Sequence, residues 1–512
     1  MGRPPFLDTP LGSFGLPVDG VALAALGVAV TWALVSYCRR AGQSVVAVPF
    51  TLQLVLWSAL AATLSALYVP WYLRGGPRVI DATSYLLAAK AIASGAFCFE
   101  TGLPSAAVRG RFLIGADASE CVGVLFPPGY PLALAAAVAV HAPLALGPLT
   151  AAAQTSVLML LARRHVGEVA ASVAATLYVL CACARYHSAD TMSHGWAALL
   201  LSTACYAWGF RRPWGDRAAG ACWGWLVATR PVTGLVALIA LALLTKADDR
   251  ALRPLAIRAL NFALGSLPFI ALWLSYNQAL TGSALYSPQA LYYALADGEP
   301  RCFRYGFGAG VGCKHEHGDF VARFMPGGYG ALEALGTTMR RLQQHLRDAA
   351  NSELGALALV AAACSRRVRP HAWLPLVIAA QVLAYLPFYY DGNYPAGGAR
   401  MFADVLPLEH LLLAAWLAPL PWRSLAGPLA LAGFALQTAY DHALLGAREG
   451  GRPYFEPRVL EAAGVRRGLV FVPSDHGFNL GHEPASGVRA LELVRWRGDG
   501  HDRVTWEQRG KP

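Results

Sequence analysis

The chain has 512 residues, of which 56% are hydrophobic and only 14% are charged, and its mean hydropathy is +0.41. Soluble globular chains carry about 25% charged residues, so this composition excludes an ordinary soluble domain and indicates an integral membrane protein. The formal net charge of +11 suggests nucleic-acid binding at first sight. The Lys and Arg residues fall in short clusters between apolar runs, however, where they set membrane topology. We therefore expect membrane lipids, and no nucleic acid, among the partners.

Apolar runs close to the spanning length of roughly 20 residues recur along most of the chain. We expect about twelve spans, at 19–38, 46–70, 147–161, 169–184, 194–210, 218–228, 232–244, 255–276, 353–364, 371–388, 401–420 and 425–445. Two of them, 218–228 and 232–244, are short enough to form one broken pair. The predicted fold class is an all-α polytopic membrane protein.

The basic clusters predict how these spans are oriented, because Lys and Arg are enriched in cytoplasmic loops. If Arg39 and Arg40 are cytoplasmic and the spans alternate, six basic clusters fall on that side: 39–40, 163–164, 211–217, 246–258, 366–369 and Arg423. Both termini and the two longest polar loops then lie outside. We therefore expect a multi-pass cell-membrane protein with these two loops outside the cytoplasm.

The expected membrane domain covers 1–446, with outer loops at 71–147 and 277–351. Within the second loop, 332–347 has apolar positions at helical spacing with basic residues between them. This pattern is typical of an amphipathic helix on the outer leaflet, although a plain loop helix fits equally well. The tail, 447–512, has strand-like pieces broken by Pro, Gly and Asp, which predicts a small β-containing extracytoplasmic domain.

Four of the ten cysteines lie in the outer loops, Cys98 and Cys121 in the first and Cys302 and Cys313 in the second. An oxidising exterior permits one disulfide within each loop. The alternative is four unpaired thiols.

Charged residues at the outer ends of spans are the candidates for chemistry, because ionisable groups are costly at membrane depth. Asp81 and Asp190 each lie at the outer end of a span, Arg230 lies where a short segment reverses, and Arg400 precedes a span. Arg binds phosphate through two parallel hydrogen bonds, and a carboxylate can deprotonate an acceptor hydroxyl or amine. The set therefore suits an anionic lipid-linked substrate. Alternatively, the carboxylates are solvated and the guanidiniums reach lipid headgroups.

Five short motifs occur in a fixed order between about residues 70 and 420. They are Asp-Ala-Thr-Ser-Tyr at 81–85, followed by an Ala-rich run to Gly95; Phe-Pro-Pro-Gly-Tyr-Pro at 126–131; Ser-Ala-Asp-Thr-Met-Ser-His-Gly-Trp at 188–196; Thr-Arg-Pro at 229–231; and Ala-Arg-Met-Phe-Ala-Asp-Val-Leu-Pro at 399–407. Together they resemble the GT-C superfamily of polyprenyl-phosphate-sugar-dependent membrane glycosyltransferases. Within it, the branch of protein O-mannosyltransferases and aminoarabinose transferases is the most similar. The chain departs from the family pattern at Ala82, where relatives have Glu.

The resemblance implies a GT-C-like helical bundle that transfers a sugar, with inversion, from a polyprenyl-phosphate carrier to a glycan, lipid or protein acceptor. Asp81 would be the general base, and Arg230 and Arg400 would hold the lipid phosphate. The second acidic position of the family aligns with either Asp190, a second catalytic candidate, or His194. The further candidates for substrate binding are Tyr85, Lys90 and His194.

A metal site and a different function remain alternatives. His315, Glu316, His317 and Asp319 are donors that a divalent cation accepts, although a His-x-His sequence in a Gly-rich loop is more often solvated or covers a substrate. The alternative function is a transporter, flippase or polymerase-like exporter of lipid-linked glycans. Such a protein should carry midplane charges and an inverted repeat, which the sequence lacks. The missing Glu makes a catalytically inactive scaffold a third reading.

Overall fold

The computed structural model describes residues 20–39, 48–73, 77, 79–100, 112–115, 121–245, 252–295, 305–312, 314–394, 397–439 and 462–464. It confirms the predicted all-α polytopic class, because helices make up most of the described chain and the strands are short. The expected tail domain lies outside the described residues apart from 462–464. The same holds for Cys302, Cys313 and the His315 side chain.

Within the described part of the chain, three helices are long and apolar enough to cross a membrane: α3 (Phe50–Trp71), α6 (Leu146–His165) and α12 (Leu252–Thr281). A fourth span results if α7 (Glu168–Val179) and α8 (Ala182–Ala189), which meet at 67°, count as one. Other apolar helices are shorter. The count of about twelve spans therefore stays a prediction.

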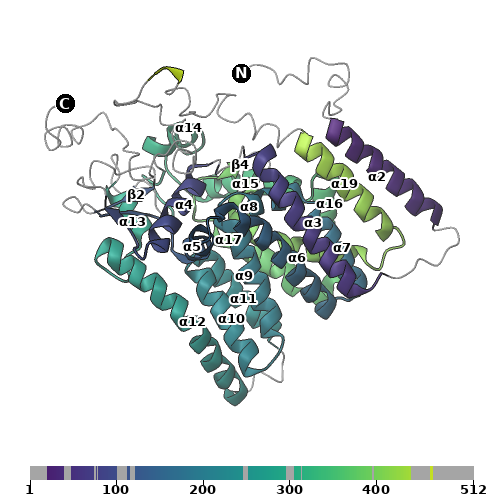
Figure 1. Ribbon diagram of the computed structural model, residues 1–512, viewed down its shortest axis with the longest axis horizontal. Coiled ribbons are helices and arrows are strands. Elements are labelled where there is room, and N and C mark those ends of the chain that lie inside the picture. Colours follow the sequence, from purple (N-terminus) through teal and green to yellow (C-terminus); the bar gives the residue numbers. More distant parts are fainter. Residues whose placement is uncertain are drawn as a thin grey trace.

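The remaining helices of the bundle follow the predicted apolar runs. They are α2 (Gly20–Arg39), α9 (Ser193–Trp208), α10 (Pro213–Val227), α11 (Pro231–Leu244), α16 (Glu353–Cys364), α17 (Trp373–Ala384), α18 (Leu406–Leu417) and α19 (Ala426–Gln437), with short 3₁₀ turns η3 (Pro143–Ala145), η5 (Arg366–His371) and η7 (Arg423–Leu425). Figure 1 shows α2 beside α19 at one side of the bundle and α12 at the other. The largest buried apolar cluster lies between them.

Helices α10 and α12 cross so closely that their backbones are in contact, because glycines lie at the crossing. A Cβ atom at Gly220 would collide with the carbonyl group of Phe262, and one at Gly265 with the carbonyl group of Arg217. Close packing of this kind holds helices together in lipid, where apolar side chains gain little by leaving the acyl chains. These glycines thus attach α12 to the bundle.

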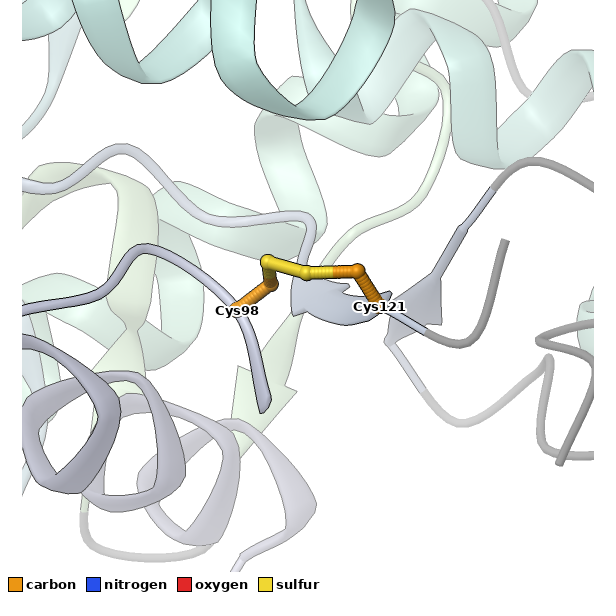
Figure 2. Close-up of a disulfide and its surroundings, with 2 residues drawn as sticks. All are labelled: Cys98 and Cys121. Atoms are coloured by element: carbon orange, nitrogen blue, oxygen red, sulfur yellow. A yellow bond between two sulfur atoms is a disulfide. The ribbon is translucent and has the colours of Figure 1, made fainter. Parts of the chain in front are cut away.

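The described part of the predicted first outer loop combines two helices with a small sheet. Its elements are α4 (Ile80–Ala93), β1 (Phe99–Glu100), β2 (Leu113–Ile114), β3 (Cys121–Val124) and α5 (Gly129–Ala139), and the strands form an antiparallel sheet in the order β1-β3-β2. A disulfide joins Cys98 to Cys121, with Cα atoms 5.6 Å apart, and ties the chain after α4 to the start of β3 (Figure 2). The disulfide that the sequence permitted in this loop is therefore present.

The start of α5 rests on the turn between α10 and α11. The Gly129 N–H donates to the Ala228 carbonyl oxygen at 2.7 Å. A Cβ atom at Gly129 would collide with the side chain of Thr229. The Pro-Pro-Gly-Tyr motif thus needs its glycine to reach the residues directly before Arg230.

The second outer loop contains α13 (Pro288–Leu295), α14 (Lys314–Phe324) and α15 (Ala331–Ala349). α4, α13 and α14 gather at one end of the molecule (Figure 1). The segment predicted as an amphipathic or plain loop helix, 332–347, lies within α15, and its Leu332 and Met339 side chains are exposed.

The structure differs from the predicted span at 401–420. The chain after α17 forms a two-stranded hairpin of β4 (Asn393–Tyr394) and β5 (Gly398–Ala399), and then a 3₁₀ helix, η6 (Arg400–Val405), before α18 begins. Long 3₁₀ runs are uncommon and often mark functional segments. The predicted span therefore begins with a separate element, and this element carries Arg400.

Candidate functional site

Asp81 and Arg400 form an ion pair between the first outer loop and η6. Asp81 lies in the first turn of α4, and Nη1 of Arg400 is 3.2 Å from its Oδ1. The two side chains are 17% and 18% exposed, respectively, so the pair is enclosed on most sides and still open to a ligand.

Arg230 lies in a second, more deeply buried cluster. It is the N-cap of α11, and its Nε donates to Oδ2 of Asp404 at 2.6 Å while Nη2 donates to the Tyr385 hydroxyl at 3.0 Å. The Asp404 side chain is fully buried. It also accepts from the Thr233 hydroxyl and lies 3.2 Å from Nδ1 of His194.

Tyr85 links the two clusters. One turn after Asp81, its hydroxyl is 3.0 Å from the Ser193 hydroxyl, and the charges of Arg230, Asp81 and Arg400 all act on it. Burial, the largest effect, raises the pKa of Tyr85 to about 12, so the hydroxyl is neutral at physiological pH.

The aromatic residues of the Phe-Pro-Pro-Gly-Tyr motif hold Tyr85 in place. Its ring stacks on Phe126 with centroids 4.5 Å apart and meets Tyr130 edge-on at 5.4 Å. Aromatic pairs at these separations stabilise each other beyond simple burial. The structure thus brings Asp81, Tyr85, Arg230 and Arg400 into one region, as the sequence motifs led us to expect.

Asp190 and His194 were the two candidates for the second acidic position of the family pattern. His194 contacts the Arg230 cluster through Asp404. Asp190 is buried, and its Oδ1 accepts from the Thr191 N–H at 2.8 Å. The Thr191 hydroxyl donates in turn to the Ala82 carbonyl oxygen at 2.9 Å. Thr191 therefore joins Asp190 to the first turn of α4, which carries Asp81.

Lys90 is placed away from the two arginines. It is nine residues after Asp81 on α4, which at the rise of an α-helix is about 13 Å along the axis. Its side chain is half-buried, and burial lowers its pKa.

His317 reaches the region from the second outer loop. Its ring stacks on Tyr390 with centroids 3.8 Å apart, and Nδ1 is 2.9 Å from the Tyr389 hydroxyl. Burial, helped by the nearby Arg400 and opposed by Asp81, lowers the pKa of His317 to about 4. Among the described residues no group of three or more His, Cys, Asp or Glu could hold a metal ion.

Sequence reasoning missed Asp404, Tyr385 and His187. Nε2 of His187 is 2.7 Å from the Gly397 carbonyl oxygen, and its ring is 4.8 Å from that of His194. The one available signal was the charge of Asp404 within an apolar run, four residues after Arg400, because a buried acid in such a run needs a partner.

The helical bundle, the two long loops and the paired charges at their junction make up a polytopic membrane fold. Among solved structures, ArnT from Cupriavidus metallidurans bound to undecaprenyl phosphate has this fold, with a TM-score of 0.54 and 13% identity over 90% of this chain and 89% of that chain. The apo form of the same protein has a TM-score of 0.52 and 14% identity over 90% and 88%.

The apo oligosaccharyltransferase of Archaeoglobus fulgidus has a TM-score of 0.41 and 14% identity over 78% of this chain and 56% of that chain, too low a likeness to argue from. No protein-family model matches the chain, and no curated protein matches its sequence. The chain is an integral membrane protein with the fold of ArnT, and at this identity the likeness shows the fold alone.

Proposed function

We propose that this protein transfers a sugar from a polyprenyl-phosphate carrier to an acceptor on the extracytoplasmic face of a bacterial inner membrane. The observation that carries the proposal is the junction of α4, α11 and η6, where a partly exposed carboxylate, Asp81, lies beside Arg400 and close to Arg230. A carboxylate can take a proton from an acceptor, and two guanidiniums can hold a phosphate. The motif resemblance and the fold of ArnT support the same reaction class.

The donor phosphate binds to Arg400 and Arg230. Arg400 is partly exposed and pairs with Asp81, and an incoming phosphate can replace this carboxylate as its partner. Arg230 is held in one orientation by Asp404 and Tyr385. Such preorganisation lowers the cost of ordering the site when the ligand binds. The solved complex of ArnT with undecaprenyl phosphate supports a polyprenyl phosphate as the carrier.

Asp81 is the general base of the proposed transfer. It accepts the proton of the acceptor hydroxyl or amine as the acceptor heteroatom bonds to the anomeric carbon on the face opposite the phosphate. The bond from that carbon to the phosphate oxygen breaks at the same time, so the polyprenyl phosphate leaves with the electron pair and the configuration inverts. Arg400 and Arg230 stabilise the charge that develops on the leaving group.

The test is transfer of sugar from a polyprenyl-phosphate donor by the purified protein, with Asp81→Asn beside the wild type. General-base catalysis contributes about 10²- to 10⁴-fold, so we expect at least a 100-fold fall in turnover. The control is Glu353→Gln, which neutralises an exposed carboxylate at the start of α16 and should leave turnover unchanged. Full turnover by the Asp81 variant would refute the assigned base. Movement of an uncleaved carrier across vesicles would support an exporter instead.

A further inference from the structure

Helix α15 of the second outer loop touches the segment that carries Arg400. Arg341 of α15 is fully buried, and its guanidinium donates to the main-chain oxygens of Tyr385 at 2.8 Å, Tyr390 at 2.7 Å and Asp391 at 3.3 Å, and to that of Phe388. These carbonyl groups belong to the chain that leaves α17. Arg341 thus fixes the path of the backbone towards β4.

Two turns later on the same helix, Asp348 holds the other end of that segment. Its Oδ2 accepts from the Gly398 N–H at 2.8 Å, two residues before Arg400. Gly398 has φ +62°, a left-handed conformation that side chains disfavour. The Asp348 carboxylate also accepts from Gln344 and Gln437, both at 2.8 Å, and is fully buried. Because the two glutamines fix the orientation of the carboxylate, the carboxylate in turn fixes the position of the Gly398 N–H.

We infer that Asp348 is a positioning residue for the donor phosphate, acting through Gly398 on Arg400. This deepens the proposed function and rests on it. The chain from the end of α17 to the first residue of η6 contains Tyr385, a partner of Arg230, and ends at Arg400. Helix α15 binds this chain near both ends, through Arg341 and Asp348, so it controls how the two guanidiniums meet the carrier.

The buried Asp348 carboxylate is the acceptor of the Gly398 N–H. Removing the carboxylate leaves the Gly398 N–H without its acceptor, and a buried donor that loses its partner drives the backbone to rearrange. The residue two positions on is Arg400, whose pairing with Asp81 requires the present backbone position. A purely structural role for Asp348 would instead lower the amount of folded protein and leave the affinity of the folded fraction unchanged.

The experiment measures the dissociation constant of the purified protein for undecaprenyl phosphate in detergent. We expect Asp348→Ala to raise it about tenfold, the effect of losing a hydrogen bond to a charged group. Gln437→Ala is the matched control. It removes one partner of Oδ1 but leaves Gln344 and Arg347 to hold the carboxylate and leaves the Gly398 contact on Oδ2 intact, so it should change the constant less than twofold. Gly398→Ala strains the backbone at the same contact and should also raise the dissociation constant about tenfold. It replaces Asp348→Ala in the experiment if that variant does not fold.

The decisive comparison repeats Asp348→Ala or Gly398→Ala in an Arg400→Ala background. If Asp348 acts only through Arg400, its loss cannot weaken phosphate binding once the Arg400 side chain is gone. In this background the second substitution should therefore change the dissociation constant less than twofold. An equal tenfold effect with and without Arg400, or no effect in the wild type, overturns the inference and leaves the proposed function standing. If Arg400→Ala itself does not weaken binding, the phosphate role of Arg400 fails, and the inference fails with it.

Discussion

Two carboxylates, Asp81 and Asp404, lie beside arginines in this site and differ in what surrounds them. Asp404 is fully buried and is surrounded by Arg230, Thr233 and His194. Asp81 is 17% exposed and pairs with Arg400. A general base must be within hydrogen-bond reach of the acceptor substrate. The partly exposed Asp81 can be reached in this way, so it is the better candidate for the base. Asp404 is suited to holding Arg230 in place.

His317 gives the protein a testable dependence on pH. Burial lowers its pKa to about 4 in the folded protein, against about 6.5 in an unfolded chain. The unfolded state therefore binds more protons between these values, and stability falls as the pH drops from about 6.5 to about 4, by up to about 3 kcal/mol.

We expect the melting temperature of His317→Phe to change less over this pH range than that of the wild type. Phe retains a ring to stack on Tyr390 and cannot be protonated. Thermal denaturation in detergent at several pH values measures the two slopes. Parallel slopes would show that His317 is not the titrating group.

Individual site residues were predictable where a charge stood out from its neighbours. Asp81, Arg230 and Arg400 occur at the ends of apolar runs, which marks them on any hydropathy profile. Asp404 lies inside an apolar run, and its partner His194 is 210 residues away. No local pattern encodes such a pair, because it exists only once the fold brings η6 against the start of α9.

At the scale of single elements, the crossing of α10 and α12 depends on glycine. Gly220→Ala would place a methyl group against the Phe262 carbonyl group. We expect it to destabilise the protein by about 1–3 kcal/mol, as overpacking does, because backbone rather than a flexible side chain would have to move. The melting temperature in detergent provides the measurement.

Gly336→Ala is the matched control, since it is also a helix-interior glycine. A Cβ atom there would meet only the end of the Arg340 side chain at 3.6 Å. Ala should be neutral or stabilise α15 by about 0.5–1 kcal/mol, because it lowers the entropy of the unfolded chain. Equal losses from both substitutions would contradict the close crossing.

Elements were predictable to the extent that they are apolar and regular. The spans at 19–38, 46–70 and 255–276 correspond to α2, α3 and α12. The run at 401–420 hid η6, since hydropathy does not distinguish a 3₁₀ segment from the α-helix that follows it. The bend between α7 and α8 was equally invisible within the run at 169–184.

At the scale of the whole molecule, the predicted orientation places the site outside and the end of α16 inside. Cys364 ends α16 and is exposed. A membrane-impermeant thiol reagent applied to intact cells should therefore not label it, whereas permeabilised cells should show labelling. After reduction, Cys98 should react from outside. Peptide mass spectrometry would identify the sites, and labelling of Cys364 in intact cells would reverse the assigned orientation.

The account as a whole requires that distant parts of the chain form one phosphate site. Asp81, Arg230 and Arg400 lie on α4, at the start of α11 and at the start of η6, and we infer that Asp348 of α15 holds the chain before Arg400 in place. The most direct measurement is an electron cryomicroscopy structure of the protein with undecaprenyl phosphate bound. We predict phosphate oxygens within about 3 Å of the guanidinium nitrogens of Arg400 and Arg230. A phosphate bound at another place, with the pair of Asp81 and Arg400 intact, would contradict the account.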